Sequence, residues 1–159
     1  MNRGYRNVVA LSHCSRVQKD QASAMRSAGY ARAMAKAGIP VDQSLIGDGT
    51  FTMESSAAWF DRLLATADPP TGLACANELG LLGALHALGK RGLTPGRDVH
   101  IVVGDNTRLA RFLPAKVGVY FVDMAAVARK LIEVHDTRIA NPLEPMATIL
   151  LEGSFHSVG

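Results

Sequence analysis

Residues 70–106 read PTGLACANELGLLGALHALGKRGLTPGRDVHIVVGDN, and this stretch decides the fold. It contains an apolar run at 71–76, leucines at helical spacing through 78–90, and a second apolar run at 99–103. We expect a strand, then a helix that begins after an N-capping Asn77, then another strand. A helix that connects two such strands forms a right-handed crossover, so the two strands lie parallel in one sheet.

The same alternation of strands and helices extends over the rest of the chain. Further strands are expected at 8–11, 45–46, 117–122 and 147–151, and further helices at 20–37, 55–67 and 124–140. The predicted fold class is therefore α/β: a doubly wound, mostly parallel sheet with helices on both faces. In sheets of this kind, ligands bind beyond the carboxyl ends of the strands.

Composition excludes several classes of protein. The 159 residues are 48% hydrophobic and 19% charged, which predicts one domain over 1–159 with a sizeable core. The net charge is only +3, and without a basic stripe a solvated surface is favoured over direct contact with nucleic acid. The longest uncharged apolar run, 79–89, is too short to span a membrane. With no secretion signal and no disulfide framework, we expect a cytoplasmic protein.

The sequence offers no catalytic or metal-binding motif. It contains no phosphate-binding GxxxxGK[ST] loop, no GxGxxG after a strand and no GxSxG elbow. The five histidines and two cysteines are not spaced as metal ligands. We therefore expect no enzyme activity, no cofactor and no metal.

Four residues are candidates for a binding site at the carboxyl edge. Asn77 and Asp105 each follow a predicted strand, but both residue types also cap helices or occupy turns. Arg26 lies on a predicted helix, where it is either solvated or a fork of donors for hydroxyl or carboxylate groups. Phe51 follows a turn, and it is either a core residue or an apolar platform for a sugar ring.

Taken together, these segments resemble a known family. The stretch 70–106, with RSAGY at 26–30 and GTFT at 49–52, resembles the effector-binding domain of the lactose/galactose-repressor (LacI/GalR) transcription regulators. The resemblance covers nearly the whole chain. It implies a lobe of the periplasmic-binding-protein type I fold, and it corresponds mainly to the carboxyl-terminal subdomain.

The resemblance also implies a role for each candidate residue. Arg26 matches the arginine that holds the hydroxyl or carboxylate groups of the effector, and Asn77 matches the asparagine after the central strand. Asp105 matches the aspartate that grips the ligand, and Phe51 matches the aromatic residue that stacks on its ring. The expected effector is a sugar or a related small molecule.

The family's organisation gives further expectations. The helix at 124–140 crosses over to an amino-terminal subdomain in such regulators, and DNA is bound by a helix-turn-helix headpiece; neither part is recognised in this chain. We therefore expect weak effector affinity here, a homodimer, no membrane contact, and DNA binding only through such a headpiece. The alternative is a stand-alone sugar-binding module of the periplasmic-binding-protein type.

Overall fold

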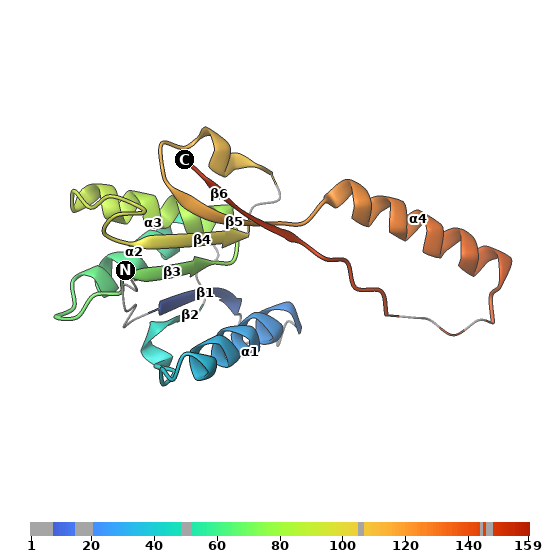
Figure 1. Cartoon of the computed structure of the whole chain (residues 1–159), viewed down its shortest axis with the longest axis horizontal. Helices are drawn as coiled ribbons and strands as arrows, with labels where there is room; N and C mark the ends of the chain where they lie inside the picture. Colours follow the sequence, from blue (N-terminus) through green and yellow to red (C-terminus); the bar gives the residue numbers. More distant parts are fainter. Residues whose placement is uncertain (1–7, 15–20, 49–51, 105–106, 144, 146–147) are drawn as a thin grey trace.

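The computed structural model describes residues 8–14, 21–48, 52–104, 107–143, 145 and 148–159 (Figure 1). Its strands are β1 Val8–Cys14, β2 Ile46–Asp48, β3 Gly72–Cys75, β4 His100–Gly104, β5 Val117–Phe121 and β6 Ser154–Val158. Its α-helices are α1 Gln21–Lys36, α2 Met53–Leu64, α3 Glu78–Lys90 and α4 Met124–Ala140. Two short 3₁₀ helices complete the elements, η1 Gln43–Leu45 and η2 Leu109–Phe112.

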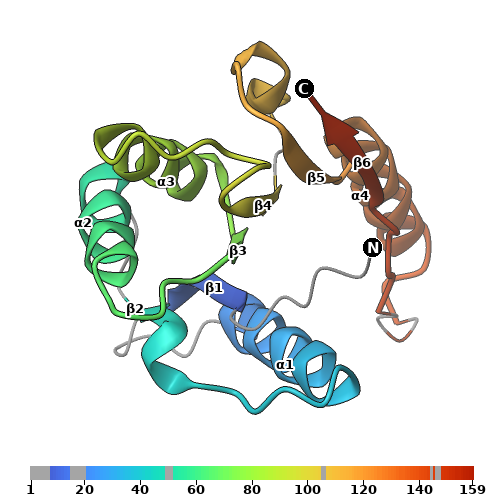
Figure 2. The same cartoon turned by 60° about the vertical axis from the view of Figure 1, so that its left-hand side comes forward.

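The six strands form one sheet in the order β2-β1-β3-β4-β5-β6. Strands β1 to β5 are parallel, and β6 pairs antiparallel with β5. Helix α1 lies on one face of the sheet and helices α2 and α3 lie on the other (Figure 2). The predicted doubly wound, mostly parallel sheet is confirmed.

The main core lies between the sheet and the α2–α3 layer. Phe60 from α2, Leu81 and Leu88 from α3, and Val103 from β4 are all fully buried there. Cys75 belongs to the same cluster, and its burial raises the pKa of the thiol well above the ordinary value. This cysteine therefore acts as a small apolar core residue.

Local capping sets the start of the two packed helices. The Asn77 side chain caps α3 by accepting a hydrogen bond from the Gly80 N–H at 3.0 Å. Thr52 and Ser55 form a capping box at the start of α2, in which each side chain bonds to the other's backbone. The Asn77 cap was expected from the sequence and is confirmed.

The predicted last strand at 147–151 is wrong. Residues 148–153 form no strand, Leu150 is 84% exposed, and the strand lies at Ser154–Val158 instead. Helix α4 has 17 residues and is therefore about 25 Å long, so the chain must run back over that distance before it can pair with β5. The apolar run falls in this returning segment, and pairing begins only after it.

Helix α4 projects away from the sheet (Figure 1). It begins at Met124 and ends at Ala140, as predicted, and no residue of it is buried. Leu131, Ile132 and Ile139 are 65%, 62% and 67% exposed. The helix therefore presents an apolar face that no described residue of this chain covers.

Candidate functional site

The turns that follow β3 and β4 meet at the carboxyl edge of the sheet. These strands are neighbours and end at Cys75 and Gly104. A Cβ added at Gly104 would lie 2.8 Å from the carbonyl oxygen of Ala76, so only glycine permits this approach of the two backbones. Glu78 joins the same two turns, because its carboxylate accepts a hydrogen bond from the Thr107 N–H at 3.2 Å.

Asn77 stands at this edge, as expected, and its half-buried side chain caps α3. The bond to Gly80 confirms the capping role that was one of its two interpretations. The same bond fixes the side-chain amide of Asn77 in the turn beside Gly104. The ligand-binding role of Asn77 stays a prediction.

Arg26 lies in the second turn of α1, and its side chain is exposed. Helix α1 follows β1, and β1 lies next to β3 in the sheet. Both Arg26 and Asn77 therefore belong to helices that start from the carboxyl ends of adjacent strands. Among the described residues, Arg26 forms no ion pair.

The other two candidates, Phe51 and Asp105, lie outside the described residues. Their neighbours are described: Thr52 caps α2, and Gly104 ends β4. Asp105 therefore follows directly in sequence from the tight contact between the two turns. Whether the four candidates share one site stays a prediction.

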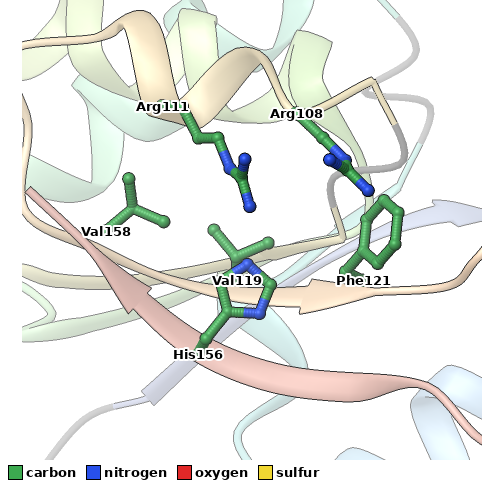
Figure 3. Close-up of a pocket in the computed structure, with 6 residues that line it drawn as sticks. All are labelled: Arg108, Arg111, Val119, Phe121, His156 and Val158. Atoms are coloured by element: carbon green, nitrogen blue, oxygen red, sulfur yellow. The ribbon is translucent and has the colours of Figure 1, made fainter.

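Sequence reasoning missed a small basic pocket beside this edge (Figure 3). It is lined by Arg108, Arg111, Val119, Phe121, His156 and Val158. The guanidinium carbon of Arg108 lies 4.9 Å from the centre of the Phe121 ring, and Phe121 is the last residue of β5. The sequence did not single out His156, because the five histidines are far apart along the chain and are not spaced as metal ligands.

A larger hollow lies on the outer side of α2 and α3, with a volume of about 630 Å³. Both apolar and charged residues line it, among them Ala57, Leu82, Glu54 and Lys90. Within the described ranges, no three His, Cys, Asp or Glu residues gather where they could hold a metal ion. No helix in the same ranges is long and apolar enough to cross a membrane.

Comparison with known proteins gives the family. The periplasmic binding protein-like domain matches residues 1–156. Catabolite control protein A of Priestia megaterium is 30% identical over 132 residues, which are 81% of this chain and 39% of that protein. The ribose operon repressor of Haemophilus influenzae is 28% identical over 127 residues, 80% of this chain and 38% of that protein.

A solved structure agrees with these sequence matches. A regulatory protein of the LacI family from Chloroflexus aggregans is 27% identical, with a TM-score of 0.84 over 96% of this chain and 54% of that one. The chain belongs to the periplasmic binding protein-like domain family, and its relatives are LacI-type transcription regulators. It spans about two fifths of the length of the curated relatives described above. These relatives do not favour the alternative of a stand-alone sugar-binding module.

Proposed function

We propose that this chain is the effector-binding and dimerisation portion of a LacI-type transcription regulator. The observation that supports this most is the carboxyl edge of the sheet, where the turns after β3 and β4 are held together at Gly104 and by the Glu78–Thr107 hydrogen bond. Ligands of doubly wound sheets bind at this edge. The edge belongs to a domain whose relatives are transcription regulators.

The proposed effector is a sugar or a related small polar molecule. Arg26 would donate to its hydroxyl or carboxylate groups, and Asp105 would accept from its hydroxyls. Asn77, fixed by its capping bond, would contribute polar contacts, and Phe51 would stack on the apolar face of the ring. Such binding needs no nucleophile, proton-transfer pair, metal or cofactor, so we propose no enzymatic activity.

The proposed lobe forms one wall of a two-lobed cleft. In this proposal, α4 crosses to the amino-terminal lobe, which agrees with its projection from the sheet and its exposed apolar face. An effector that bridges the two lobes would change their relative position, and couplings of this kind amount to about 1–3 kcal/mol. DNA would be bound by a separate headpiece in the cytoplasm. The change in the relative position of the lobes would alter the DNA binding of that headpiece.

Chemical-shift mapping tests the proposed site. Backbone amide resonances of the whole chain are followed while ribose, glucose or a purine nucleoside is added into the millimolar range. We expect saturable shifts at the amides of Gly80 and Thr107, because both lie in the joined turns. The amides of Thr94 and Asp98, in the turn that precedes β4, should not move.

Two arginine variants provide the matched comparison. Arg26→Ala is expected to weaken the binding about fivefold or more, as the loss of a charged hydrogen-bond donor does. Arg32→Ala removes the same exposed charge from a later turn of α1 and should leave the affinity unchanged. Shifts centred away from the carboxyl edge, or equal effects of the two substitutions, would contradict the proposed site.

A further inference from the structure

The basic pocket between η2 and the β5–β6 edge brings together two strands and a short helix. Val119 of β5 pairs in register with His156 of β6, and Val117 pairs with Val158. Residues two apart on a strand point to the same face, so Val119 and Phe121 form the floor of the pocket together with His156 and Val158. Figure 3 shows the side chain of Arg111, from η2, and that of Arg108, from the residue before η2, reaching over this floor.

The two arginines are held over the pocket by η2. Arg111 lies within η2 and Arg108 is the residue directly before it, and the Arg111 N–H donates to the Arg108 carbonyl oxygen at 3.2 Å. Ala110, between them, is fully buried and anchors the short helix to the core. The Arg108 guanidinium also stacks over the Phe121 ring, and a guanidinium in that position keeps its in-plane N–H donors available.

The positive charge of the pocket has no counter-charge among the described residues. Neither Arg108 nor Arg111 forms an ion pair there, whereas Arg91 and Arg97 each bond to an aspartate at 2.8 Å and 2.9 Å. Among the described residues no carboxylate lines the pocket, and the His156 ring adds a further polar group to it. In that part of the chain, the pocket therefore gathers two guanidinium groups with no carboxylate to pair with them.

The size of the pocket limits what it can hold. Its cavity volume is about 30 Å³, which corresponds to two or three water molecules at about 10–15 Å³ each. A sugar ring does not fit into this space. A small oxyanion does, and arginine pairs are suited to phosphate oxygens because each guanidinium donates two parallel hydrogen bonds.

We propose that Arg108, Arg111 and His156 form a binding site for a phosphate group. The group is either free inorganic phosphate or the phosphate ester of a small metabolite whose remainder lies outside the pocket. The Arg108–Phe121 end lies where β5 ends, so an ester bound here would extend toward the carboxyl edge of the sheet. This site is separate from the sugar contacts proposed above and does not depend on them.

The test follows the backbone amides of the whole chain during titration with inorganic phosphate, at constant ionic strength set with sodium chloride. We expect saturable shifts at Val119 and His156 with a dissociation constant in the millimolar range. Arg108→Gln and Arg111→Gln should each weaken binding about fivefold or more, as expected when a charge-assisted hydrogen bond is lost. Arg32→Gln on α1, across the sheet, should leave the affinity unchanged.

Two further titrations distinguish the sources of the phosphate group. Tighter binding of glucose 6-phosphate than of inorganic phosphate, with glucose itself not moving these amides, supports an ester. Binding of inorganic phosphate without binding of the ester supports a free ion. Shifts that never saturate, or an equal loss in the Arg32→Gln and Arg111→Gln variants, would overturn the proposal, because only general screening of positive charge would then remain.

Discussion

Two glycines of α3 show how strongly the environment of one residue decides its role. A Cβ added at Gly83 would lie 2.7 Å from the Met53 carbonyl oxygen and 2.7 Å from the Ser56 Cβ, both in α2. At Gly89, in the same helix, an added Cβ would meet nothing within 4 Å. The absence of a side chain at Gly83 therefore allows α2 and α3 to pack closely.

Gly83→Ala is expected to destabilise the protein by about 1–2 kcal/mol. Overpacking of a close contact costs about 1–3 kcal/mol, and the better helix propensity of alanine offsets up to about 1 kcal/mol of it. Gly89→Ala, which has the propensity gain alone, is expected to stabilise by up to about 1 kcal/mol. Urea denaturation of both variants measures the difference, and equal effects would contradict the packing described here.

For single residues, the sequence predicted a structural role where neighbouring residues alone indicate it. The capping role of Asn77 follows from its position directly before a run of helical leucines, and the structure has this cap. Arg108 and His156 are 48 positions apart, and only the β5–β6 pairing brings them into one pocket. No local pattern contains that pairing, so the pocket could not be found from the sequence.

At the scale of elements, the best predictions were those with clear signals at both ends. Helices α3 and α4 begin and end where predicted, because a capping residue precedes α3 and Asn141-Pro142 follows α4. The last strand was misplaced because the apolar run at 147–151 predicts a strand but does not indicate whether that segment lies beside β5. Its true position depends on the length of α4, which is a long-range constraint.

Helix α4 gives the prediction that belongs to this scale: in a sample of these 159 residues alone, where no amino-terminal lobe covers it, the apolar face of α4 packs on a second copy of the chain. Each leucine or isoleucine that becomes fully buried contributes about 1.5–3 kcal/mol, and three such side chains are exposed on α4. Light scattering at high micromolar concentration should give twice the 16.9 kDa of one chain. A clean 16.9 kDa species would contradict the prediction.

Two variants identify the surface responsible. The pair Leu131→Glu and Ile139→Glu should give a monomer that is as folded as the wild type, because both side chains are well exposed in one chain. Thr137→Glu introduces the same residue about 120–160° around the helix from Leu131, Ile132 and Ile139 and should stay dimeric. Dissociation by Thr137→Glu, but not by the paired substitution, would place the interface elsewhere.

At the scale of the whole molecule, the proposal makes this chain one lobe of a periplasmic binding protein-like fold, from which helix α4 projects. A cleft between two lobes surrounds its ligand, whereas a single lobe leaves much of a ligand in water. Polar contacts at one exposed edge then compete with solvent, and each adds only about 0.5–1.5 kcal/mol. The low affinity expected for this chain follows from its shape as well as from its residues.

Calorimetry with a panel of sugars and purines measures how tightly the carboxyl edge of the sheet binds an effector by itself. If the carboxyl edge of this lobe is one wall of a two-lobed effector site, the whole chain should bind these ligands no more tightly than in the millimolar range. A micromolar dissociation constant for any of them corresponds to about 8 kcal/mol of binding free energy. That result would contradict the claim, because one exposed edge would then supply a complete binding site.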